Sequence, residues 1–380
     1  MDLNEAREQI DIIDDQMAKL FEKRMDLARE IGTYKYDNKL PAVNRTRERE
    51  IINRIANGVN EEYAGYSKAL FNMLFDLSRA YQNRFINPDP AMEQEINKAI
   101  ETTPRMFPTK ATVACQGAEG AYSQIACDKM FNIPNIMYFQ EFEGVFQGVE
   151  QGLCRYGILP IENSTAGSVN EVYDLMKKYK FYIVKSLRLK VDHALLAKKG
   201  VVMENIKEIV SHEQAISQCY NFLKQMPEIK ITLCENTATA ARMVAESPRN
   251  DIAAISSVYC GSLYGLNILG ENIQDNGSNF TRFICITKDL EIYPGADKIS
   301  LMLTVPHSPG SLYRVITRFS SLGLNLTKLE SRPIPGKDFE FMFYFDIDAS
   351  CYSEDVLKLL CQLESELPQF SYLGSYTEIC

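Results

Sequence analysis

Apolar residues recur at intervals of three, four and seven along the first 36 positions, which predicts one long amphipathic helix. The stripe begins at Leu3 and reaches Ile31, and neither glycine nor proline interrupts it before Gly32. At about 1.5 Å of rise per residue, a helix from Leu3 to Tyr36 is roughly 50 Å long. That length is unusual for a compact unit of this size, so we expect a second chain to pack along the stripe in the manner of a coiled coil.

A cation lies within this stripe. Arg24 has Leu20 and Leu27 as neighbours four and three positions away, so its guanidinium projects into apolar surroundings unless an anion meets it. An ion pair with Glu48, or an arginine that reaches out to water, is an alternative to a bound anion. Arg7 and Arg24 are 17 positions apart, which is about 26 Å along a helix. If both bind one small ligand, they come from different chains.

The first 86 residues are predicted to be entirely helical, with a second helix after Pro41 and a third from about residue 61 to residue 85. On the third helix Ser78 and Gln82 replace apolar residues in the stripe, either as surface residues or as part of a polar pocket. Residues 87–109 are polar and proline-punctuated, which is typical of a linker.

Short β-rich runs alternate with helical runs over residues 110–288, which predicts an α/β domain with mostly parallel strands. The apolar run from Phe181 to Lys198 is too long for one strand and is expected to cross between two lobes, and TRFICITK is expected to return as a closing strand. Residues 297–380 follow the order strand, helix, strand, strand, helix, strand, which predicts an α+β unit of the ferredoxin-like kind.

Composition narrows the kind of ligand. The chain has 380 residues and a net charge of −9, which argues against nucleic acid as the main partner. No apolar run is long enough to span a membrane and the first residues are charged, so we expect a cytoplasmic protein. The ten cysteines form no CxxC pair and the three histidines are not at metal-ligand spacing, so we expect no metal and no cofactor.

Over almost its whole length the chain resembles the bifunctional chorismate mutase–prephenate dehydratases of phenylalanine biosynthesis that carry a C-terminal ACT regulatory domain. In the helical region the resemblance rests on a set of polar residues: Arg7, Arg24, Lys35, Arg47, Glu48, Ser78 and Gln82. It implies an intertwined helical dimer that binds chorismate through these residues and Asn44, with Arg47 and Ser78 on the carboxylate side. Asn44 stands where many relatives have aspartate, which puts the role of that side chain in doubt.

The implied mutase reaction is an intramolecular rearrangement, so the site must hold and polarise chorismate rather than attack it. The resemblance assigns Arg7 of the partner chain and Arg24 to the two substrate carboxylates, because forked guanidinium contacts fix orientation as well as charge. Lys35 and Gln82 would donate to the ether oxygen as its bond breaks, and Glu48 would accept from the ring hydroxyl. These three are the predicted catalytic residues of the mutase.

In residues 110–288 the resemblance rests on GAEGAYS (117–123), PIENSTAGSV (160–169), DH (192–193), SHEQAISQC (211–219) and NFTRF (279–283). It implies a two-lobed domain, like periplasmic binding proteins, that converts prephenate to phenylpyruvate. Loss of the ring hydroxyl needs a hydrogen-bond donor or acid, and the resemblance assigns this role to Thr281, with Asn163 and Gln218 as further catalytic donors. A strand-end or capping threonine is the alternative interpretation of Thr281.

The prephenate-binding residues implied by the same motifs are Glu162, Asn163, Ser164, Thr165, Ser168 and Arg282. Residues 163–168 precede a predicted helix, and free N–H groups at a helix start suit a carboxylate. An ordinary N-cap is the alternative.

In residues 297–380, PGSL (309–312) and ESRP (330–333) resemble the phenylalanine-sensing motifs of ACT domains. The implied effector is L-phenylalanine, and the implied effector-binding residues are Gly310, Ser311, Leu312, Glu330 and Ser331. A ferredoxin-like dimerisation module without a ligand is the alternative for this domain. Two alternatives stand for the whole chain, namely a non-catalytic amino-acid sensor and a dehydratase whose helical arm is only structural.

Overall fold

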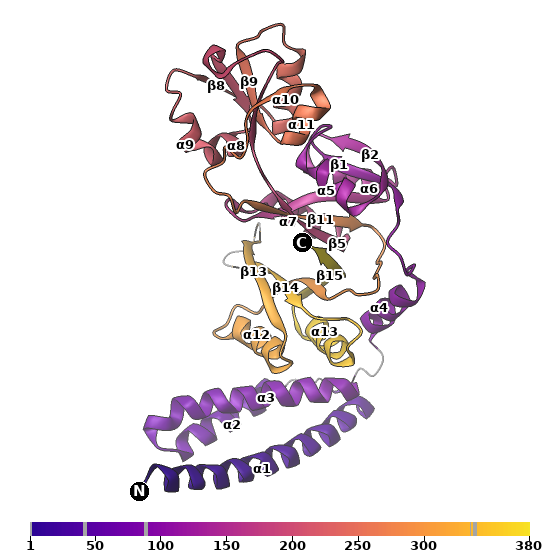
Figure 1. The fold of residues 1–380 in the computed structure, drawn as a ribbon. Coiled ribbons are helices and arrows are strands. Elements are labelled where there is room, and N and C mark those ends of the chain that lie inside the picture. The colour runs from indigo at the N-terminus through magenta and orange to yellow at the C-terminus, as the bar shows by residue number, and fades with distance from the viewer. Residues whose placement is uncertain (1, 41–43, 87–89, 335, 337–339) are drawn as a thin grey trace.

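The computed structural model describes residues 2–40, 44–86, 90–334, 336 and 340–380. A helical region, a region with two β-sheet lobes and a C-terminal α+β domain follow one another along the sequence. In space the order differs, because the C-terminal domain lies between the helical region and the two lobes (Figure 1).

The helical region is an antiparallel arrangement dominated by one long helix, as predicted (Figure 1). Its elements are α1 (Leu3–Asp37), α2 (Arg45–Gly58), the short 3₁₀ helix η1 (Glu61–Tyr63) and α3 (Ala64–Ile86). Helices α1 and α3 approach closely at Gly32, where an added Cβ would lie 3.1 Å from the carbonyl oxygen of Gln82. This contact brings the C-terminal half of α1 against α3.

The N-terminal half of α1 leaves its apolar stripe uncovered. Leu3 is 63% exposed, Ile10 is 55% exposed and Leu20 is 66% exposed. Such a long row of exposed aliphatic side chains is uncommon on a monomer surface. Ala28 and Gly32 are buried in the same helix, but Leu27 is 51% exposed and Ile31 is 47% exposed, so most of the apolar stripe is uncovered along α1.

The middle region consists of two lobes, each with its own sheet. The strands of the first lobe are β1 (Lys110–Gln116), β2 (Ile133–Phe139), β3 (Tyr156–Asn163), β4 (Gly167–Ser168), β5 (Tyr182–Lys190) and β11 (Phe280–Thr287). Those of the second lobe are β6 (Ala194–Ala197), β7 (Glu208–Ser211), β8 (Lys230–Leu233), β9 (Ile252–Ser256) and β10 (Asn267–Gly270). The helices are α5 (Tyr122–Met130), α6 (Phe142–Glu150), α7 (Asn170–Tyr179), η2 (Met203–Asn205), α8 (Glu213–Gln218), α9 (Tyr220–Leu223), α10 (Thr237–Glu246) and α11 (Val258–Tyr264).

The chain crosses between the lobes twice, and both crossings were predicted from the sequence. Strand β5 belongs to the first sheet and β6 to the second, and β11 returns to lie between β3 and β5. The sheets are more mixed than predicted. Strands β1, β2 and β3 are parallel, but β11 is antiparallel to both of its neighbours because it returns directly from the second lobe.

The C-terminal domain has the predicted βαββαβ order. Its elements are β12 (Lys298–Thr304), α12 (Ser311–Ser321), β13 (Asn325–Pro333), β14 (Phe341–Asp348), α13 (Glu354–Glu366) and β15 (Gln369–Ile379). The sheet order is β13-β14-β12-β15, and β13 is an edge strand. The end of β15 then pairs in parallel with β5, so one sheet runs through this domain and the first lobe.

Two features tie the domains together more closely than the sequence indicated. Gly374 of β15 has φ 127°, and a Cβ there would lie 2.3 Å from the Ile183 carbonyl oxygen, so glycine permits the two sheets to merge. The predicted linker contains α4 (Ala91–Thr102), which buries Met92 and Ile96 in the core of the C-terminal domain. Residues 87–89 of that linker lie outside the described residues.

Candidate functional site

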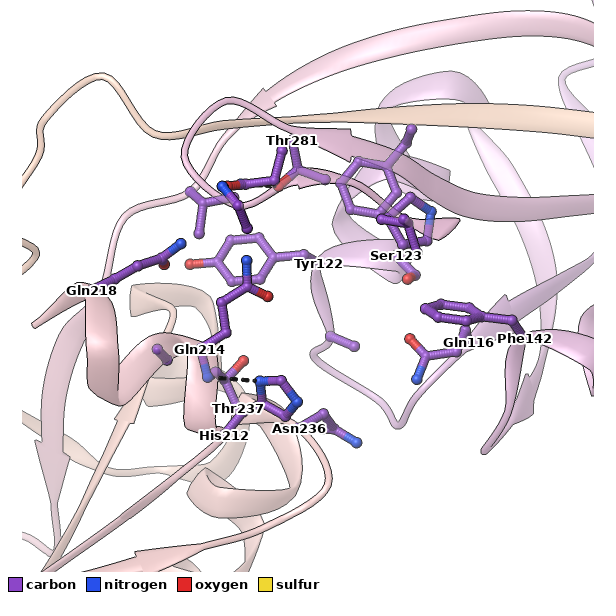
Figure 2. Close-up of a pocket in the computed structure, with 18 of the residues that line it drawn as sticks. Gln116, Tyr122, Ser123, Phe142, His212, Gln214, Gln218, Asn236, Thr237 and Thr281 are labelled. Carbon is purple, nitrogen blue, oxygen red and sulfur yellow. Dashed lines mark hydrogen bonds between the residues drawn. The ribbon is translucent and has the colours of Figure 1, made fainter. Parts of the chain in front are cut away.

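A cleft of about 420 Å³ lies between the two lobes. Both lobes line it: Asn163, Thr281 and Phe283 come from strands of the first, and His212 and Thr237 come from helix starts of the second. Figure 2 shows Thr281 across the cleft from His212, Asn236 and Thr237, with Gln116 and Phe142 on a third side. Polar groups thus converge on a partly open cleft that is large enough for a small metabolite.

A hydrogen-bond network joins Asn163 to Thr281 at one wall of the cleft. These residues are paired on neighbouring strands β3 and β11, and the Asn163 amide donates to Thr281 Oγ1 at 2.9 Å and to Asn279 Oδ1 at 2.8 Å. The Asn279 amide in turn donates to Gln218 Oε1 at 3.0 Å. All but Gln218 are buried, so the network is fixed by the sheet and holds the Thr281 hydroxyl in place.

Gln218 carries the network to a buried histidine. Its Oε1 atom also lies 2.9 Å from His193 Nε2, so His193 donates from that nitrogen. His193 Nδ1 is buried without a hydrogen-bond partner, and burial lowers the pKa of His193 below its usual value. The imidazole is therefore neutral near neutral pH, with a proton on Nε2 and an acceptor at Nδ1.

The start of α10 adds a second kind of group to the cleft. Asn236 Oδ1 accepts from Thr239 N at 2.8 Å and caps this ten-residue helix. Both Asn236 and Thr237 line the cleft. The positive end of the helix dipole thus faces the space between the lobes, which favours an anion there.

Strand alternation places two of the predicted binding residues outside the cleft. Glu162 directly precedes Asn163 in β3, and Arg282 directly follows Thr281 in β11. The two strands are paired in register, so the side chains of Glu162 and Arg282 project from the opposite face of the sheet. Glu162 forms an ion pair with Lys328. Arg282 is buried and contacts the Asp346 carboxylate at 2.5 Å and the Tyr376 hydroxyl at 2.6 Å, both in the C-terminal domain. The prediction that these two bind the substrate is wrong for this structure.

The loop after β3 also differs from the prediction. The N–H groups of Thr165 and Ala166 donate to Asn163 Oδ1 at 3.0 and 2.9 Å, so they form a local turn rather than a free helix start. Thr165 Oγ1 accepts from Gln218 Nε2 at 3.2 Å and thus joins the network. Ser164 Oγ is bonded to the backbone at Ser278 and Phe280 and has a structural role. Ser168 lines the cleft.

Several of these groups were missing from the predicted set. His193 lies in the DH motif and Asn279 in the NFTRF motif. The dipeptide DH is too short to indicate a function for His193, and the sequence gives no reason to single out Asn279, two positions before Thr281. The start of α10 could not be found because its capping asparagine resembles any other N-cap. Their proximity arises from the lobe crossing, which brings three separate segments to one wall.

A second polar cluster lies in the helical region. The Arg24 guanidinium donates to the Leu74 carbonyl oxygen at 2.9 Å and to the Ser78 hydroxyl. Within the described part of the chain it forms no ion pair, and Glu48 is paired with Arg79 instead. The alternative of an Arg24–Glu48 ion pair is therefore wrong. Burial lowers the pKa of Arg24, and no carboxylate among the described residues of the single chain forms an ion pair with it.

Lys35 and Glu48 extend the same cluster. Lys35 Nζ donates to Gln82 Oε1 at 3.0 Å; burial lowers the Lys35 pKa, and the nearby Glu48 carboxylate opposes that shift. Ser78 and Gln82 are both buried. Arg79, which the sequence did not single out, lies one residue from Ser78 and binds Glu48 and Asp76. The structure thus brings Arg24, Lys35, Glu48, Ser78 and Gln82 together.

Three predicted chorismate-binding residues lie apart from this cluster. Arg7 is exposed near the far end of α1. Arg47 is exposed and pairs with Glu50 at 3.1 Å. Asn44 Oδ1 accepts from Arg47 N at 3.0 Å and caps α2, a role that asparagine and aspartate perform about equally well.

The predicted effector residues divide between two places. Gly310, with φ 78°, precedes α12, and the Ser311 hydroxyl lies 2.7 Å from Ser308 Oγ and 2.8 Å from Arg314 Nη2. Leu312 packs against the core of the domain. On β13, Ser331 is exposed, whereas Glu330 accepts from Ser168 at 2.7 Å on the other face. A ligand bound on the outer face of β13 can contact Ser331 but not the side chain of Glu330, which lies on the opposite face.

Within the described residues, no three His, Cys, Asp or Glu side chains are close enough to hold a metal ion. None of the helices in that part of the chain combines the length and the hydropathy needed to cross a bilayer.

Comparison with known proteins defines the class of each region. Residues 6–83 match the family model for chorismate mutase type II, and residues 113–291 match the model for prephenate dehydratase. The fold resembles that of a prephenate dehydratase from Arthrobacter aurescens solved with L-Phe, with a TM-score of 0.64 and 27% identity over 70% of this chain and 90% of that chain. The protein thus contains one domain of the mutase class and one of the dehydratase class.

The full-length relatives fix the particular family. The chain is 31% identical over 379 residues to the bifunctional chorismate mutase/prephenate dehydratase of Escherichia coli strain K12, covering 97% of this chain and 95% of the relative. It is 33% identical over 313 residues to arogenate dehydratase/prephenate dehydratase 2 of Arabidopsis thaliana, covering 79% of this chain and 80% of that protein. The chain belongs to the bifunctional chorismate mutase/prephenate dehydratase family.

Both activities follow from this membership. The helical domain has chorismate mutase activity and the α/β domain has prephenate dehydratase activity, which are consecutive steps of phenylalanine biosynthesis. This outcome favours the enzyme over the non-catalytic sensor and over a dehydratase with a purely structural arm.

Proposed function

We propose that the cleft between the lobes is the prephenate site and that Thr281 donates the hydrogen bond or proton to the departing ring hydroxyl. The observation that carries this proposal is the buried network that fixes Thr281 Oγ1 through Asn163, Asn279 and Gln218. A threonine hydroxyl is a weak acid in water, but an oriented network in a low-dielectric site strengthens its hydrogen bonds.

The remaining groups of the cleft suit the rest of prephenate. Departure of carbon dioxide needs a carboxylate that is held but not strongly stabilised, and the start of α10 beside Asn236 and Thr237 offers backbone donors for one carboxylate. His193 keeps Gln218 in position through its Nε2–H group. Because burial lowers the His193 pKa, the imidazole is expected to take a second proton, at the partnerless Nδ1, only below its ordinary value of 6.5, and the buried charge then disturbs the site and lowers dehydratase activity.

Replacing His193 tests this part of the site. His193→Leu removes the donor to Gln218, and the dehydratase kcat is expected to fall about tenfold, roughly the worth of one buried hydrogen bond. His193→Gln keeps an N–H at a similar reach and is expected to retain most of the activity. Phenylpyruvate formation is measured from about pH 5 to pH 8, the range in which histidine changes its charge. Equal activity of the Leu and Gln variants would argue against the role of His193.

For the mutase we propose that chorismate binds at the cluster of Arg24, Lys35, Glu48, Ser78 and Gln82, and that Arg7 of a second copy completes the site. The single uninterrupted helix α1 supports this proposal, because Arg7 and Arg24 of one chain are about 26 Å apart. The exposed apolar stripe of α1 is the surface on which a second chain would pack. A symmetric dimer then holds two shared sites.

We further propose that the C-terminal domain is an ACT domain that binds L-phenylalanine and inhibits the dehydratase. The βαββαβ order and the left-handed Gly310 before α12 support it, and the Arthrobacter prephenate dehydratase was solved with L-Phe. Ser331 on the exposed face of β13 is a candidate contact. Inhibition of this kind requires the ligand to favour one of two inter-domain arrangements.

Titration with L-phenylalanine tests the effector proposal. Dehydratase activity is expected to fall with rising ligand, and Ser331→Ala is expected to raise the concentration needed by about tenfold, as lost hydrogen bonds do. Ser321→Ala, at the far end of α12, is the control and is expected to behave as the wild type. A dehydratase that ignores saturating L-phenylalanine, while calorimetry detects no binding, would contradict the proposal.

A further inference from the structure

One strand of the C-terminal domain presents a polar face to the dehydratase. Along β13 exposed and half-buried residues alternate, and Lys328, Glu330 and Arg332 are the half-buried ones that face the first lobe. Leu329 and Ser331 lie on the outer face. Arg332 Nη2 contacts the Asp174 carboxylate of α7 at 2.9 Å, so the inner face of β13 lies along the lobe that carries Thr281.

Lys328 is the central residue of this contact. Its ammonium pairs with the Glu162 carboxylate and donates to Ser168 Oγ at 3.1 Å. Ser168 Oγ donates in turn to Glu330 Oε2 at 2.7 Å. The Lys328 side chain is only 13% exposed, so solvent screens these charges less than it screens an ordinary surface pair. Its ammonium also lies 5.4 Å from the centroid of the Tyr173 ring.

Glu162 and Ser168 are partners across a short hairpin. Strands β3 and β4 pair Glu162 with Ser168 and Asn163 with Gly167, so one lysine bonded to both Glu162 and Ser168 closes the base of the hairpin. The turn between them carries the N–H groups that donate to Asn163 Oδ1. The opposite end of that same amide donates to Thr281 Oγ1.

We propose that Lys328 and Glu330 are positioning residues of the dehydratase, supplied by the C-terminal domain. They hold the 163–168 hairpin against the lobe and thereby keep the Asn163 amide aligned with Thr281. Neither residue lines the cleft, so both act through the hairpin and not on prephenate itself. The inference rests on the proposed role of Thr281, and it gives the C-terminal domain a part in catalysis in the absence of any effector.

The expected consequence of losing the clamp is a poorly aligned site. In Lys328→Met the Glu162 carboxylate loses its cation and Ser168 loses a donor, and misplacement of a catalytic network costs on the order of tenfold to a hundredfold in rate. The dehydratase kcat is therefore expected to fall by about tenfold or more, with a smaller change in KM because groups at the start of α10 remain. Mutase activity of the same protein is expected to be unchanged.

Matched variants separate positioning from general damage. Lys328→Arg keeps the charge and is expected to restore most of the kcat. Lys358→Met removes a lysine of the same domain that pairs with Glu354 four residues earlier, and it is expected to leave both activities unchanged. If Lys328→Met does not fold, Glu330→Ala tests the clamp instead, because it removes only the acceptor of the Ser168 hydroxyl. It is expected to lower the dehydratase kcat severalfold, as the loss of a hydrogen bond does.

The proposal is overturned if folded Lys328→Met, or Glu330→Ala in its place, dehydrates prephenate at the wild-type rate. It is also overturned if mutase and dehydratase activities fall together in proportion to lost folded protein. Thr281→Ala, assayed in the same experiment, separates failure of the Lys328 clamp from failure of the proposed dehydratase site. If Thr281→Ala is inactive and Lys328→Met is fully active, only the clamp fails; if Thr281→Ala is fully active, the proposed dehydratase site fails as well.

Discussion

Thr281→Ala is expected to lose dehydratase activity by at least about a hundredfold, the usual worth of a positioned proton donor, while the mutase keeps its full rate. The change removes the only hydroxyl that Asn163 orients from β11 among the described residues. The protein should fold normally, because the alanine leaves the β3–β11 pairing intact. Phenylpyruvate formation from added prephenate measures the loss.

Thr281→Ser is the control for this prediction. Serine keeps the hydroxyl at the same position along the chain, so it is expected to retain a substantial part of the activity. If Thr281→Ala dehydrates prephenate as fast as Thr281→Ser, the hydroxyl is not the donor and the alternative, a strand-end threonine, holds.

Arg24→Ala is expected to lower mutase turnover by about a hundredfold to a thousandfold, as the removal of an electrostatic donor from an enclosed site does. Arg24 is the half-buried cation that contacts Ser78 without a carboxylate partner in the described chain. Arg24→Lys keeps the charge but loses the fork and is expected to recover only part of the rate. Chorismate consumption measures the effect, and unchanged consumption would support the structural-arm interpretation.

The same variant tests the shared site. Arg7→Ala and Arg24→Ala are each expected to be inactive as mutases, but mixed dimers hold one site that has both arginines. After full subunit exchange, roughly a quarter of the wild-type activity is expected, because half of the dimers are mixed and one site in two is intact. No recovery after verified exchange would show that Arg7 does not act across the dimer.

The sequence predicts most of the architecture because each element has its own periodicity. The 35-residue helix α1, the two lobe crossings and the βαββαβ order were all visible as local patterns. The merging of β15 with β5 was not, because pairing between distant strands leaves no local signal, and only Gly374 marks the close approach.

The candidate sites were predicted less evenly, and strand geometry explains the difference. A sequence motif such as NFTRF or PIENS contains residues that are adjacent in the chain, but adjacent residues of a strand point to opposite faces of the sheet. Asn163 and Thr281 thus reach the cleft, whereas Glu162 and Arg282 reach the C-terminal domain. The same rule separates Glu330 from Ser331 on β13. On α3, Ser78 and Gln82 both face α1, where they contact Arg24 and Lys35, because residues four apart on a helix share one face.

The most direct test of the whole account is to supply the purified protein with chorismate and to follow chorismate, prephenate and phenylpyruvate separately. We expect that chorismate is consumed, that prephenate appears and that phenylpyruvate follows, with Thr281→Ala stopping at prephenate and Arg24→Ala converting only added prephenate. Phenylpyruvate formed from chorismate at the wild-type rate by both variants would contradict the assignment of the two reactions to these two sites.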